Sequence, residues 1–267
     1  MHSERIMTAM TQEKITTGRA IDIVTESFNG IECLHAAPAG QRATALPVVI
    51  FWHGYLSSKE VYAWAAVALA QAGFRVIMPD ADQHGARYGG NSAYRLAHFW
   101  DILRSSIDEL PQLEAALRTQ GLIAEGRFGV AGASMGGMTA LGAMARYPHI
   151  NRVACLMGSG YFMSLSQRLF PPLQAETPEE QAERARLLAP LAGYDPSRQL
   201  ERLADRPLLL WHGEADDVVP VAETQRLVQA LTSAQLDQQL SWLTEPGVGH
   251  KITPQALEAL VSFFASL

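Results

Sequence analysis

The residues best suited to do chemistry lie in the stretch Gly132-Ala133-Ser134-Met135-Gly136. The pattern Gly-x-Ser-x-Gly is typical of a nucleophile elbow, a sharp turn from a strand into a helix with the serine at its apex. The residues beside this turn must lack bulk, because the backbone passes close to a neighbouring strand and to the new helix. An apolar run precedes the pattern, and a stretch rich in Ala, Gly and Met follows it. The sequence therefore predicts a nucleophilic Ser134 over a helix N-terminus, whose dipole favours negative charge.

A serine hydroxyl is a weak nucleophile until a base takes its proton, and that base needs an acid to orient it. The serine pattern also occurs by chance, so the assignment depends on finding these partners. In folds with an elbow they follow in the order Ser, Asp or Glu, His. The apolar run 208–211 leads into a loop with Asp216 and Asp217, and the next expected strand leads to His250. We expect His250 to be the general base and then the general acid, oriented by Asp216 or by the neighbouring Asp217.

Negative charge develops on the substrate carbonyl oxygen during attack, so two N–H donors must face it in an oxyanion hole. The N–H of Met135, directly after the serine, is expected to be the first donor. The second is expected from the loop after the apolar run 47–52, at Tyr55 in His53-Gly54-Tyr55. The His-Gly-Gly-Gly loop of many lipases is absent from the sequence, which argues against a true lipase.

Five further residues are candidates for the substrate pocket, and each also has a purely structural interpretation. His84 lies in a polar loop at 80–91, where it either caps the loop or contacts the substrate. The other four are apolar residues that either wall an acyl pocket or form a small local core: Tyr161, Phe162, Leu169 and Phe170. The remaining histidines are expected to be scaffolding, including His53 and His212, which precede glycines at strand ends.

The elements that must position these residues alternate between strands and helices. Strands are expected at 20–27, 31–35, 47–52, 74–78, the run before Ser134, 153–157, 206–211 and 236–243, with a hairpin at Asn29-Gly30. Helices are expected at 61–72, about 96–120 with a kink or restart at Pro111, 135–147, 178–188, 221–231 and 254–267. This alternation predicts an α/β fold with parallel βαβ units, in a mostly parallel eight-stranded sheet with helices on both faces.

One segment, 160–205, breaks this rhythm because it shows no strand pattern. An interdomain linker is one interpretation, but the sheet pattern resumes at 206, so we interpret the segment as a small helical cap insertion. The chain at 19–267 is then a single domain. Residues 1–18 are polar and mixed in character and are predicted to form a flexible N-terminal tail.

The composition excludes several classes of function. The chain has 267 residues, of which 48% are hydrophobic and 18% are charged, as in an ordinary soluble globular protein. A net charge of −6 and the lack of a Lys/Arg cluster argue against a nucleic-acid partner. No apolar run approaches the roughly 18 residues of a membrane helix, so no membrane partner is expected. Without the apolar core of a signal peptide, a cytoplasmic protein is expected.

Metal and cofactor chemistry are not indicated either. The sequence contains no H-E-x-x-H pair, no phosphate-binding loop and no dinucleotide fingerprint, so we expect no metal and no cofactor. Cys33 and Cys155 lie in apolar stretches and are expected to be buried, reduced thiols. The oligomeric state is not indicated by the sequence.

Taken together, the motifs resemble those of the α/β-hydrolase superfamily and, within it, bacterial serine esterases of the prolyl-oligopeptidase-like group. The resemblance spans about residues 20–267. It rests on Val48-Val49-Ile50-Phe51-Trp52-His53-Gly54, Val76-Ile77-Met78-Pro79-Asp80, Gly132-Ala133-Ser134-Met135-Gly136, Met157-Gly158-Ser159-Gly160-Tyr161-Phe162 and His212-Gly213-x-x-Asp216-x-x-Val219-Pro220.

The resemblance implies roles for the residues that match these motifs. The Asp three residues after the glycine of the last motif is the triad acid of that group, which implies Asp216 and not Asp217. The late Gly-x-x-His segment implies His250 as the base. The implied activity is a cofactor-independent carboxylesterase that acts on short- to medium-chain acyl esters. Hydrolysis of thioesters or peptides by the same triad is the alternative, and a non-catalytic ligand-binding module on this scaffold is a third.

Overall fold

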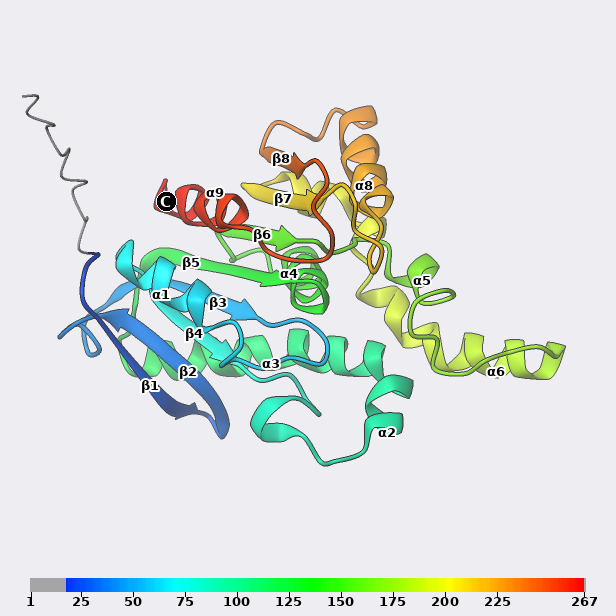
Figure 1. The fold of residues 1–267 in the computed structure, drawn as a ribbon, viewed down its shortest axis with the longest axis horizontal. Helices are drawn as coiled ribbons and strands as arrows, with labels where there is room; N and C mark the ends of the chain where they lie inside the picture. Colours follow the sequence, from blue (N-terminus) through cyan, green and yellow to red (C-terminus); the bar gives the residue numbers. More distant parts are fainter. Residues whose placement is uncertain (1–17, 267) are drawn as a thin grey trace, which may run out of the picture.

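The eight strands of the described chain form one sheet with helices on both faces (Figure 1). The computed structural model describes residues 18–266, so the predicted N-terminal tail lies outside the described residues except for Gly18. The strands are β1 (Ile21–Phe28), β2 (Ile31–Pro38), β3 (Leu46–Trp52), β4 (Arg75–Pro79), β5 (Ile123–Ala133), β6 (Arg152–Leu156), β7 (Leu208–Gly213) and β8 (Leu240–Glu245).

The helices that flank this sheet are α1 (Ala63–Gln71), α2 (Ser92–Ala97), α3 (Phe99–Thr119), α4 (Met135–Arg146), α5 (Phe162–Leu165), α6 (Pro178–Leu188), α7 (Leu200–Ala204), α8 (Val221–Ser233) and α9 (Pro254–Ala265). Short 3-10 turns lie at η1 (Gly85–Arg87), η2 (Ala189–Gly193) and η3 (Pro196–Arg198). Among residues 18–266, no helix has both the length and the apolar character needed to cross a membrane.

The strand order confirms the predicted fold class. The order is β1-β2-β4-β3-β5-β6-β7-β8, in which β2 runs antiparallel to its two neighbours and the pairs from β4 to β8 are parallel. The predicted hairpin is also present, since Phe28 pairs with Ile31 and both turn residues, Asn29 and Gly30, have positive φ. The result is a mostly parallel α/β sheet, with the antiparallel strand pairs confined to the β1 end.

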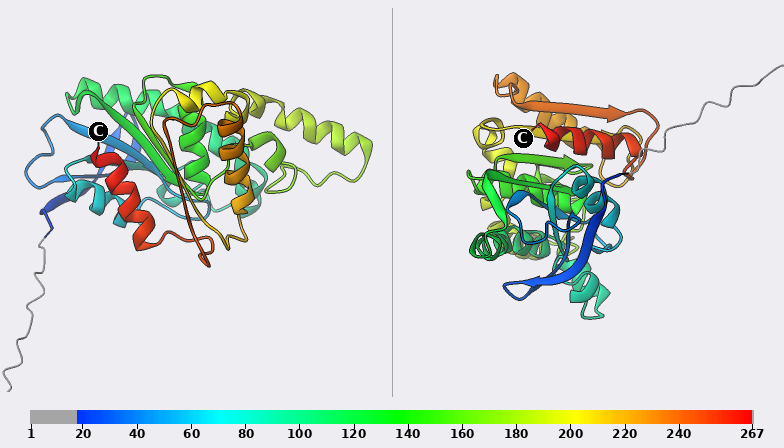
Figure 2. Two further views of the ribbon diagram at one scale, coloured as in Figure 1. Left: turned by 90° about the horizontal axis from the view of Figure 1, so that it is seen from above. Right: turned by 90° about the vertical axis from the view of Figure 1, so that its left-hand side faces the viewer.

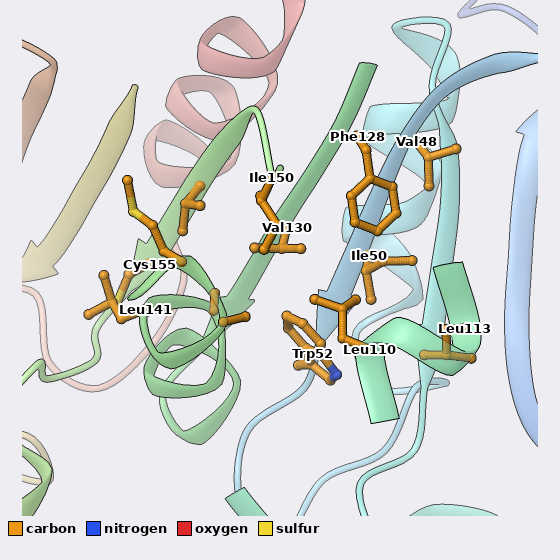
Figure 3. Close-up of a cluster of buried hydrophobic side chains, with 14 of the residues drawn as sticks. Val48, Ile50, Trp52, Leu110, Leu113, Phe128, Val130, Leu141, Ile150 and Cys155 are labelled. Atoms are coloured by element: carbon orange, nitrogen blue, oxygen red, sulfur yellow. The ribbon is translucent and has the colours of Figure 1, made fainter. Parts of the chain in front are cut away.

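Alternate residues of the central strands enter two different cores. Val48, Ile50 and Trp52 of β3 pack toward α3 and α4, as Figure 3 shows. Val49 and Phe51 point to the other face, where they pack against residues of α1 and α9. All five are at most 2% exposed. A strand buried on both faces needs an unbroken apolar run, which is why 47–52 carries no polar residue.

A helical region is present at 96–120 as predicted, but the predicted kink or restart at Pro111 is wrong. The chain forms two helices, α2 and α3, which meet at His98, whose φ of −110° and ψ of 20° are not helical. Pro111 lies inside α3, and the helix continues through it. Proline cannot donate to the carbonyl four residues earlier, which here belongs to Ile107. The Tyr147 hydroxyl donates to that carbonyl at 3.2 Å, so the group freed by the proline has a partner.

Several strand bounds also differ from the prediction. β2 runs to Pro38, and β5 begins already at Ile123. The last strand, β8, spans Leu240–Glu245, whereas 236–243 was predicted. The N–H of Leu236 donates to the carbonyl of Leu231 at the end of α8, so the chain is still part of the helix C-terminus at 236 and the strand begins later. β8 pairs with β7 alone among the described strands, so it is an edge strand.

The segment between β6 and β7 holds α5, α6, η2, η3 and α7, and no strand. Helix α6 extends away from the sheet (Figures 1 and 2). It begins with a capping box, in which Thr177 and Glu180 each accept a backbone hydrogen bond from the other. Leu165, Leu188 and Leu191 of this segment share a core with the first half of α3. The first part of the segment thus packs on α3, whereas α7 packs on α4 and joins the core beneath the sheet through Leu203.

Candidate active site

The turn from β5 into α4 has the geometry of a nucleophile elbow. Ser134 has a φ of 57° and a ψ of −118°, a strained backbone for a residue with a side chain. Its N–H donates to the carbonyl of Leu156 on β6 at 2.8 Å. A Cβ on Gly136 would lie 2.0 Å from the carbonyl oxygen of Trp52, and one on Gly132 would lie 2.3 Å from Gly136. The two glycines therefore let three backbone segments meet beneath the serine.

The structure brings the three predicted catalytic side chains together. The Nε2 atom of His250 lies 2.9 Å from Ser134 Oγ, and its Nδ1 atom lies 2.7 Å from Asp216 Oδ2. Asp217 is exposed and makes no such contact, which separates the two candidate acids. The other oxygen of Asp216 accepts the N–H groups of Val218 and Val219, both at 2.9 Å. These bonds aim the carboxylate at the imidazole.

The charge state of Asp216 follows from these contacts. Burial raises the pKa of the Asp216 carboxyl, but hydrogen bonds from His212, from His250 and from the Val219 N–H outweigh it. The net result holds the pKa of Asp216 well below its ordinary value. The group is therefore a carboxylate that keeps the Nδ1–H tautomer of His250 and stabilises the imidazolium when it forms.

His212 contacts the acid directly, which the sequence did not predict. Its side chain is fully buried, and Nε2 lies 3.2 Å from Asp216 Oδ2 and 2.7 Å from the Val219 carbonyl. Its Nδ1 lies 2.7 Å from the hydroxyl of Thr224, which donates to the carbonyl of Gly158 at 2.9 Å. His212 and His250 thus contact the same oxygen of Asp216. The signal for this role was the spacing of His-Gly-x-x-Asp, a tight turn that returns the acid to the end of β7.

The two predicted oxyanion donors lie beside the serine. Met135 is the first residue of α4, so its N–H has no acceptor within the helix. Gly54 touches the elbow, since a Cβ there would lie 3.5 Å from the Cβ of Ser134. Tyr55 follows Gly54 and lines the cavity that contains Ser134. The ring of Tyr55 packs on Phe170, with a centroid distance of 4.8 Å, as its expected packing role requires.

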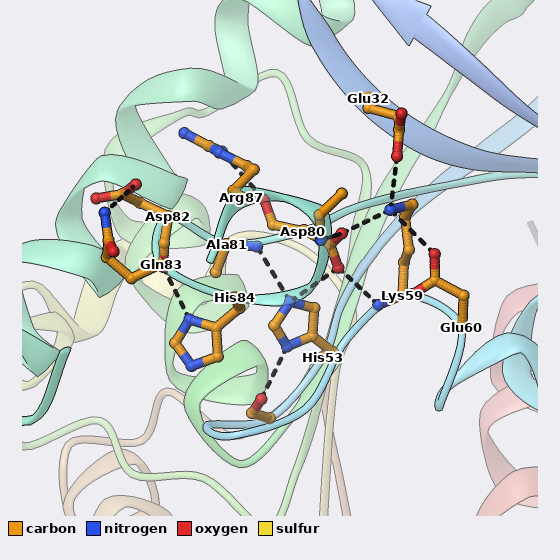
Figure 4. A network of polar contacts seen from close by, with 12 residues as sticks. Glu32, His53, Lys59, Glu60, Asp80, Ala81, Asp82, Gln83, His84 and Arg87 are labelled. Carbon is orange, nitrogen blue, oxygen red and sulfur yellow. Dashed lines mark hydrogen bonds and ion pairs between the residues drawn. The ribbon is translucent and has the colours of Figure 1, made fainter. Parts of the chain in front are cut away.

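A buried polar network holds the loop that carries Tyr55 (Figure 4). His53 donates from Nδ1 to the Gly54 carbonyl at 2.8 Å and accepts the N–H of Ala81 at Nε2, at 3.0 Å. The Lys59 ammonium lies 2.6 Å from Asp80 Oδ2, and the Lys59 N–H donates to Asp80 Oδ1 at 2.8 Å. Both side chains of this pair are 1% exposed. His53 is therefore scaffolding, as predicted.

His84 caps its own loop. Its Nδ1 donates to the Asp82 carbonyl at 2.8 Å, and its side chain is fully buried. The ring lies against the rings of His53 and Tyr55, at centroid distances of 5.3 and 5.4 Å. Its Nε2 atom has no hydrogen-bond partner within the described chain. Burial, followed by the nearby His53 and Arg95 charges, outweighs the bond to Asp82 and lowers the pKa of His84 to about 4.

This pKa predicts a pH dependence of stability. In the unfolded chain a histidine takes up a proton near pH ~6.5, whereas folded His84 stays neutral down to about pH 4. The unfolded state therefore binds more protons in this window, and the free energy of unfolding should fall as the pH drops from 6.5 to 4. In His84→Gln the slope between these limits should be flatter by up to about 1.4 kcal/mol per pH unit, measured by urea unfolding. Equal slopes in the two proteins would contradict the assignment.

The cavity at Ser134 has a volume of about 340 Å³. It lies between the segment from Gly54 to Trp64 and the loop from His250 to Ile252, and Met157 also lines it. The sequence did not single out these walls. Apolar residues beside the motif loops, such as Trp64 and Ile252, were the available signal.

The four predicted acyl-pocket residues of the segment 160–205 lie elsewhere. None of them is among the residues that line this cavity. Phe162 is fully buried against Trp100, at 5.8 Å between ring centroids, and the Leu169 carbonyl accepts the Trp100 indole N–H at 3.3 Å. Phe170 stacks on Phe99, at 4.4 Å between ring centroids. The guanidinium of Arg226 lies 3.4 Å from the centroid of the Tyr161 ring. These contacts favour the alternative in which the residues form the local core.

The sheet order, the elbow and the aligned Ser–His–Asp side chains define an α/β-hydrolase with the site of a serine hydrolase. The chain belongs to the prolyl oligopeptidase family, whose model matches residues 59–266. It is 52% identical over 244 residues to esterase YjfP of Escherichia coli strain K12, across 91% of this chain and 98% of that protein. It is 37% identical to YitV of Bacillus subtilis strain 168, again across 91% and 98%.

A solved structure shares the same fold. The crystal structure of TT1662 from Thermus thermophilus superposes with a TM-score of 0.73 at 23% identity, and the match covers 93% of this chain and 99% of that one. At this identity the likeness concerns the fold alone.

Proposed function

We propose that this protein is a serine carboxylesterase that hydrolyses short- to medium-chain acyl esters through an acyl-enzyme on Ser134. The observation that carries the proposal is the position of His250, with Nε2 2.9 Å from Ser134 Oγ and Nδ1 2.7 Å from Asp216. The name of the E. coli relative, an esterase at 52% identity, supports the ester as the substrate class.

In the first half of the reaction, Ser134 Oγ attacks the ester carbonyl carbon while its proton passes to Nε2 of His250. The N–H groups of Met135 and Tyr55 stabilise the oxyanion that forms. The bond between the carbonyl carbon and the alcohol oxygen then breaks, and the imidazolium returns the proton to that oxygen. The alcohol leaves, and the acyl group stays on Ser134.

In the second half, water repeats the attack on the acyl-enzyme. His250 takes a proton from the water as its oxygen bonds to the acyl carbon. The bond to Ser134 Oγ breaks, the proton passes from His250 to that oxygen, and the carboxylic acid leaves. Asp216 remains a carboxylate throughout both halves, in keeping with its lowered pKa.

A peptide is the second candidate substrate, because the family is that of the prolyl oligopeptidases. The same triad transfers acyl groups from amides, esters and thioesters. A panel of p-nitrophenyl, thioester and peptide p-nitroanilide substrates with one acyl group ranks them by kcat/KM. We expect the ester to rank first.

The test of the proposal is to trap the acyl-enzyme. With p-nitrophenyl acetate, a burst of nitrophenolate about equal to the enzyme concentration should precede steady turnover when deacylation is slow. A fluorophosphonate should add to one site, and peptide mass spectrometry should place it on Ser134. Turnover that survives full labelling of Ser134 would overturn the proposal.

We further propose a cytoplasmic location, supported by the two free, buried thiols of Cys33 and Cys155.

A further inference from the structure

The cavity at Ser134 continues into a second, outer cavity of about 290 Å³. Trp64 and Ile252 line both, so the two cavities adjoin at these side chains, the first at the serine and the second at the start of α9. The outer part is completed by Thr253, Pro254 and Leu257. We call this surface, from Ser134 to Leu257, the α1–α9 groove.

The outer half of the α1–α9 groove is apolar in character. Apart from the Thr253 hydroxyl and the indole N–H of Trp64, the side chains that line it carry no polar atom. The Thr253 hydroxyl already donates to the Glu245 carboxylate and accepts the N–H of Ala256 at 3.0 Å. Trp64 is half-buried and held edge-on against Phe51, at 6.4 Å between ring centroids. The outer half of the groove therefore suits a hydrocarbon more than a polar group.

The position of His250 decides which part of an ester lies in this groove. Its Nε2 must deliver a proton to the oxygen of the departing alcohol, so that oxygen lies on the His250 side of the reacting carbon. The acyl substituent points away from His250. One wall of the groove begins at His250 and continues through Ile252, so the groove starts where the alcohol departs.

The cap side of the site is closed by packed side chains. Phe170 stacks on Phe99 and packs at a tilt against Tyr55, and Met135 and Met138 are 1% exposed in the same cluster. A long acyl chain would have to displace this packing, whereas a short one would not.

We propose that the α1–α9 groove binds the alcohol part of the substrate, so that the preferred substrates are esters of a short acid with an apolar alcohol. This inference rests on the esterase function proposed above. Trp64, Ile252 and Leu257 then set the preference for the length of the alcohol.

Two isomeric esters test the orientation, because hexyl acetate and ethyl hexanoate contain the same atoms. We expect kcat/KM for hexyl acetate to exceed that for ethyl hexanoate by about tenfold or more. Ethyl acetate, small on both sides, is the reference substrate.

Two variants test the lining residues. Trp64→Ala and, independently, Leu257→Asn should each lower the ratio of kcat/KM for hexyl acetate over ethyl acetate by about tenfold. The ratio for ethyl hexanoate over ethyl acetate should change by less than about twofold.

The controls separate a failure of the groove from a failure of the esterase. Each ratio compares two substrates on one enzyme preparation, so a loss of folded enzyme affects both rates equally and cancels. If Trp64→Ala does not fold, Leu257→Asn at the outer end of the groove still tests the proposal. Leu187→Ala removes a leucine on α6 that is 46% exposed and should leave the ratios unchanged. If the wild type hydrolyses none of the esters, the proposed function itself is wrong. If it hydrolyses ethyl acetate but prefers ethyl hexanoate, or if both ratios fall together, only the assignment of the groove is wrong.

Discussion

Replacing Ser134 by alanine should lower kcat for p-nitrophenyl acetate by about 10³-fold or more and abolish the burst. The variant keeps the oxyanion donors and the cavity but has no oxygen to attack the ester. It also leaves His250 Nε2 without the hydroxyl that lies 2.9 Å away in the wild type. The residual rate should be that of water attacking in the preorganised site. Initial rates and pre-steady-state traces of the two proteins provide the measurement.

The matched control is Ser105→Ala, which removes a hydroxyl on α3 that donates to the Ile102 carbonyl at 2.9 Å. Its kcat should stay within about twofold of the wild type. Circular dichroism and urea unfolding should show both variants folded. A kcat of Ser134→Ala within tenfold of the wild-type value would contradict the assignment of Ser134 as the nucleophile.

Replacing Asp80 by asparagine should lower the free energy of unfolding at pH 7 by about 3–5 kcal/mol. The substitution keeps the shape of the side chain but removes the charge opposite the buried Lys59 ammonium, at 2.6 Å. Lys59 retains Glu32 and Glu60, at 3.0 and 3.1 Å, but their side chains are 50% and 61% exposed, so solvent weakens both ion pairs. A native domain is stable by only about 5–15 kcal/mol, so this loss is a large fraction of the total.

The Lys59–Asp80 pair also predicts how the free energy of unfolding depends on pH. Burial raises the pKa of Asp80, but hydrogen bonds from the Lys59 ammonium and from the N–H groups of Lys59 and Ala86 outweigh it, so the net pKa lies below its ordinary value. The carboxylate therefore contributes stability above the pKa of the unfolded chain, near ~3.9, and loses it as the pH falls through the folded pKa. The gap between wild type and Asp80→Asn in urea unfolding should narrow below pH 4.

Asp82→Asn is the control on the same loop, because its carboxylate makes only a 3.3 Å contact with the Gln83 amide. Its free energy of unfolding should change by less than about 0.5 kcal/mol. A loss in Asp80→Asn no larger than this would show that the buried pair is not needed.

Most of the fold could be predicted because its signals are local. An apolar run such as 47–52 must be a strand buried on both faces, and Asn29-Gly30 has the backbone freedom of a tight hairpin. The continuation of α3 through Pro111 could not be predicted, because the carbonyl that the proline cannot reach accepts the hydroxyl of Tyr147, 36 residues after Pro111 in the sequence. A contact over that distance leaves no trace in a local pattern.

The candidate site divides in the same way. Ser134, Asp216 and His250 could be predicted, since each lies in a loop directly after a strand and parallel strands bring such loops to one edge of the sheet. The walls of the cavity could not be predicted. Trp64 and Ile252 look like ordinary core residues of their own segments, and only the packing of α1 near α9 places them side by side.

The edge position of β8 has a consequence for how the enzyme loses activity. His250 follows this strand, which has one neighbour and half-exposed side chains such as Leu243 at 43%. Ser134 and Asp216 follow β5 and β7, each flanked by strands on both sides. Edge elements open at a lower free-energy cost than the interior of a sheet. We therefore expect fraying of β8 to withdraw the imidazole while the rest of the molecule stays folded, so that reversible inactivation precedes melting.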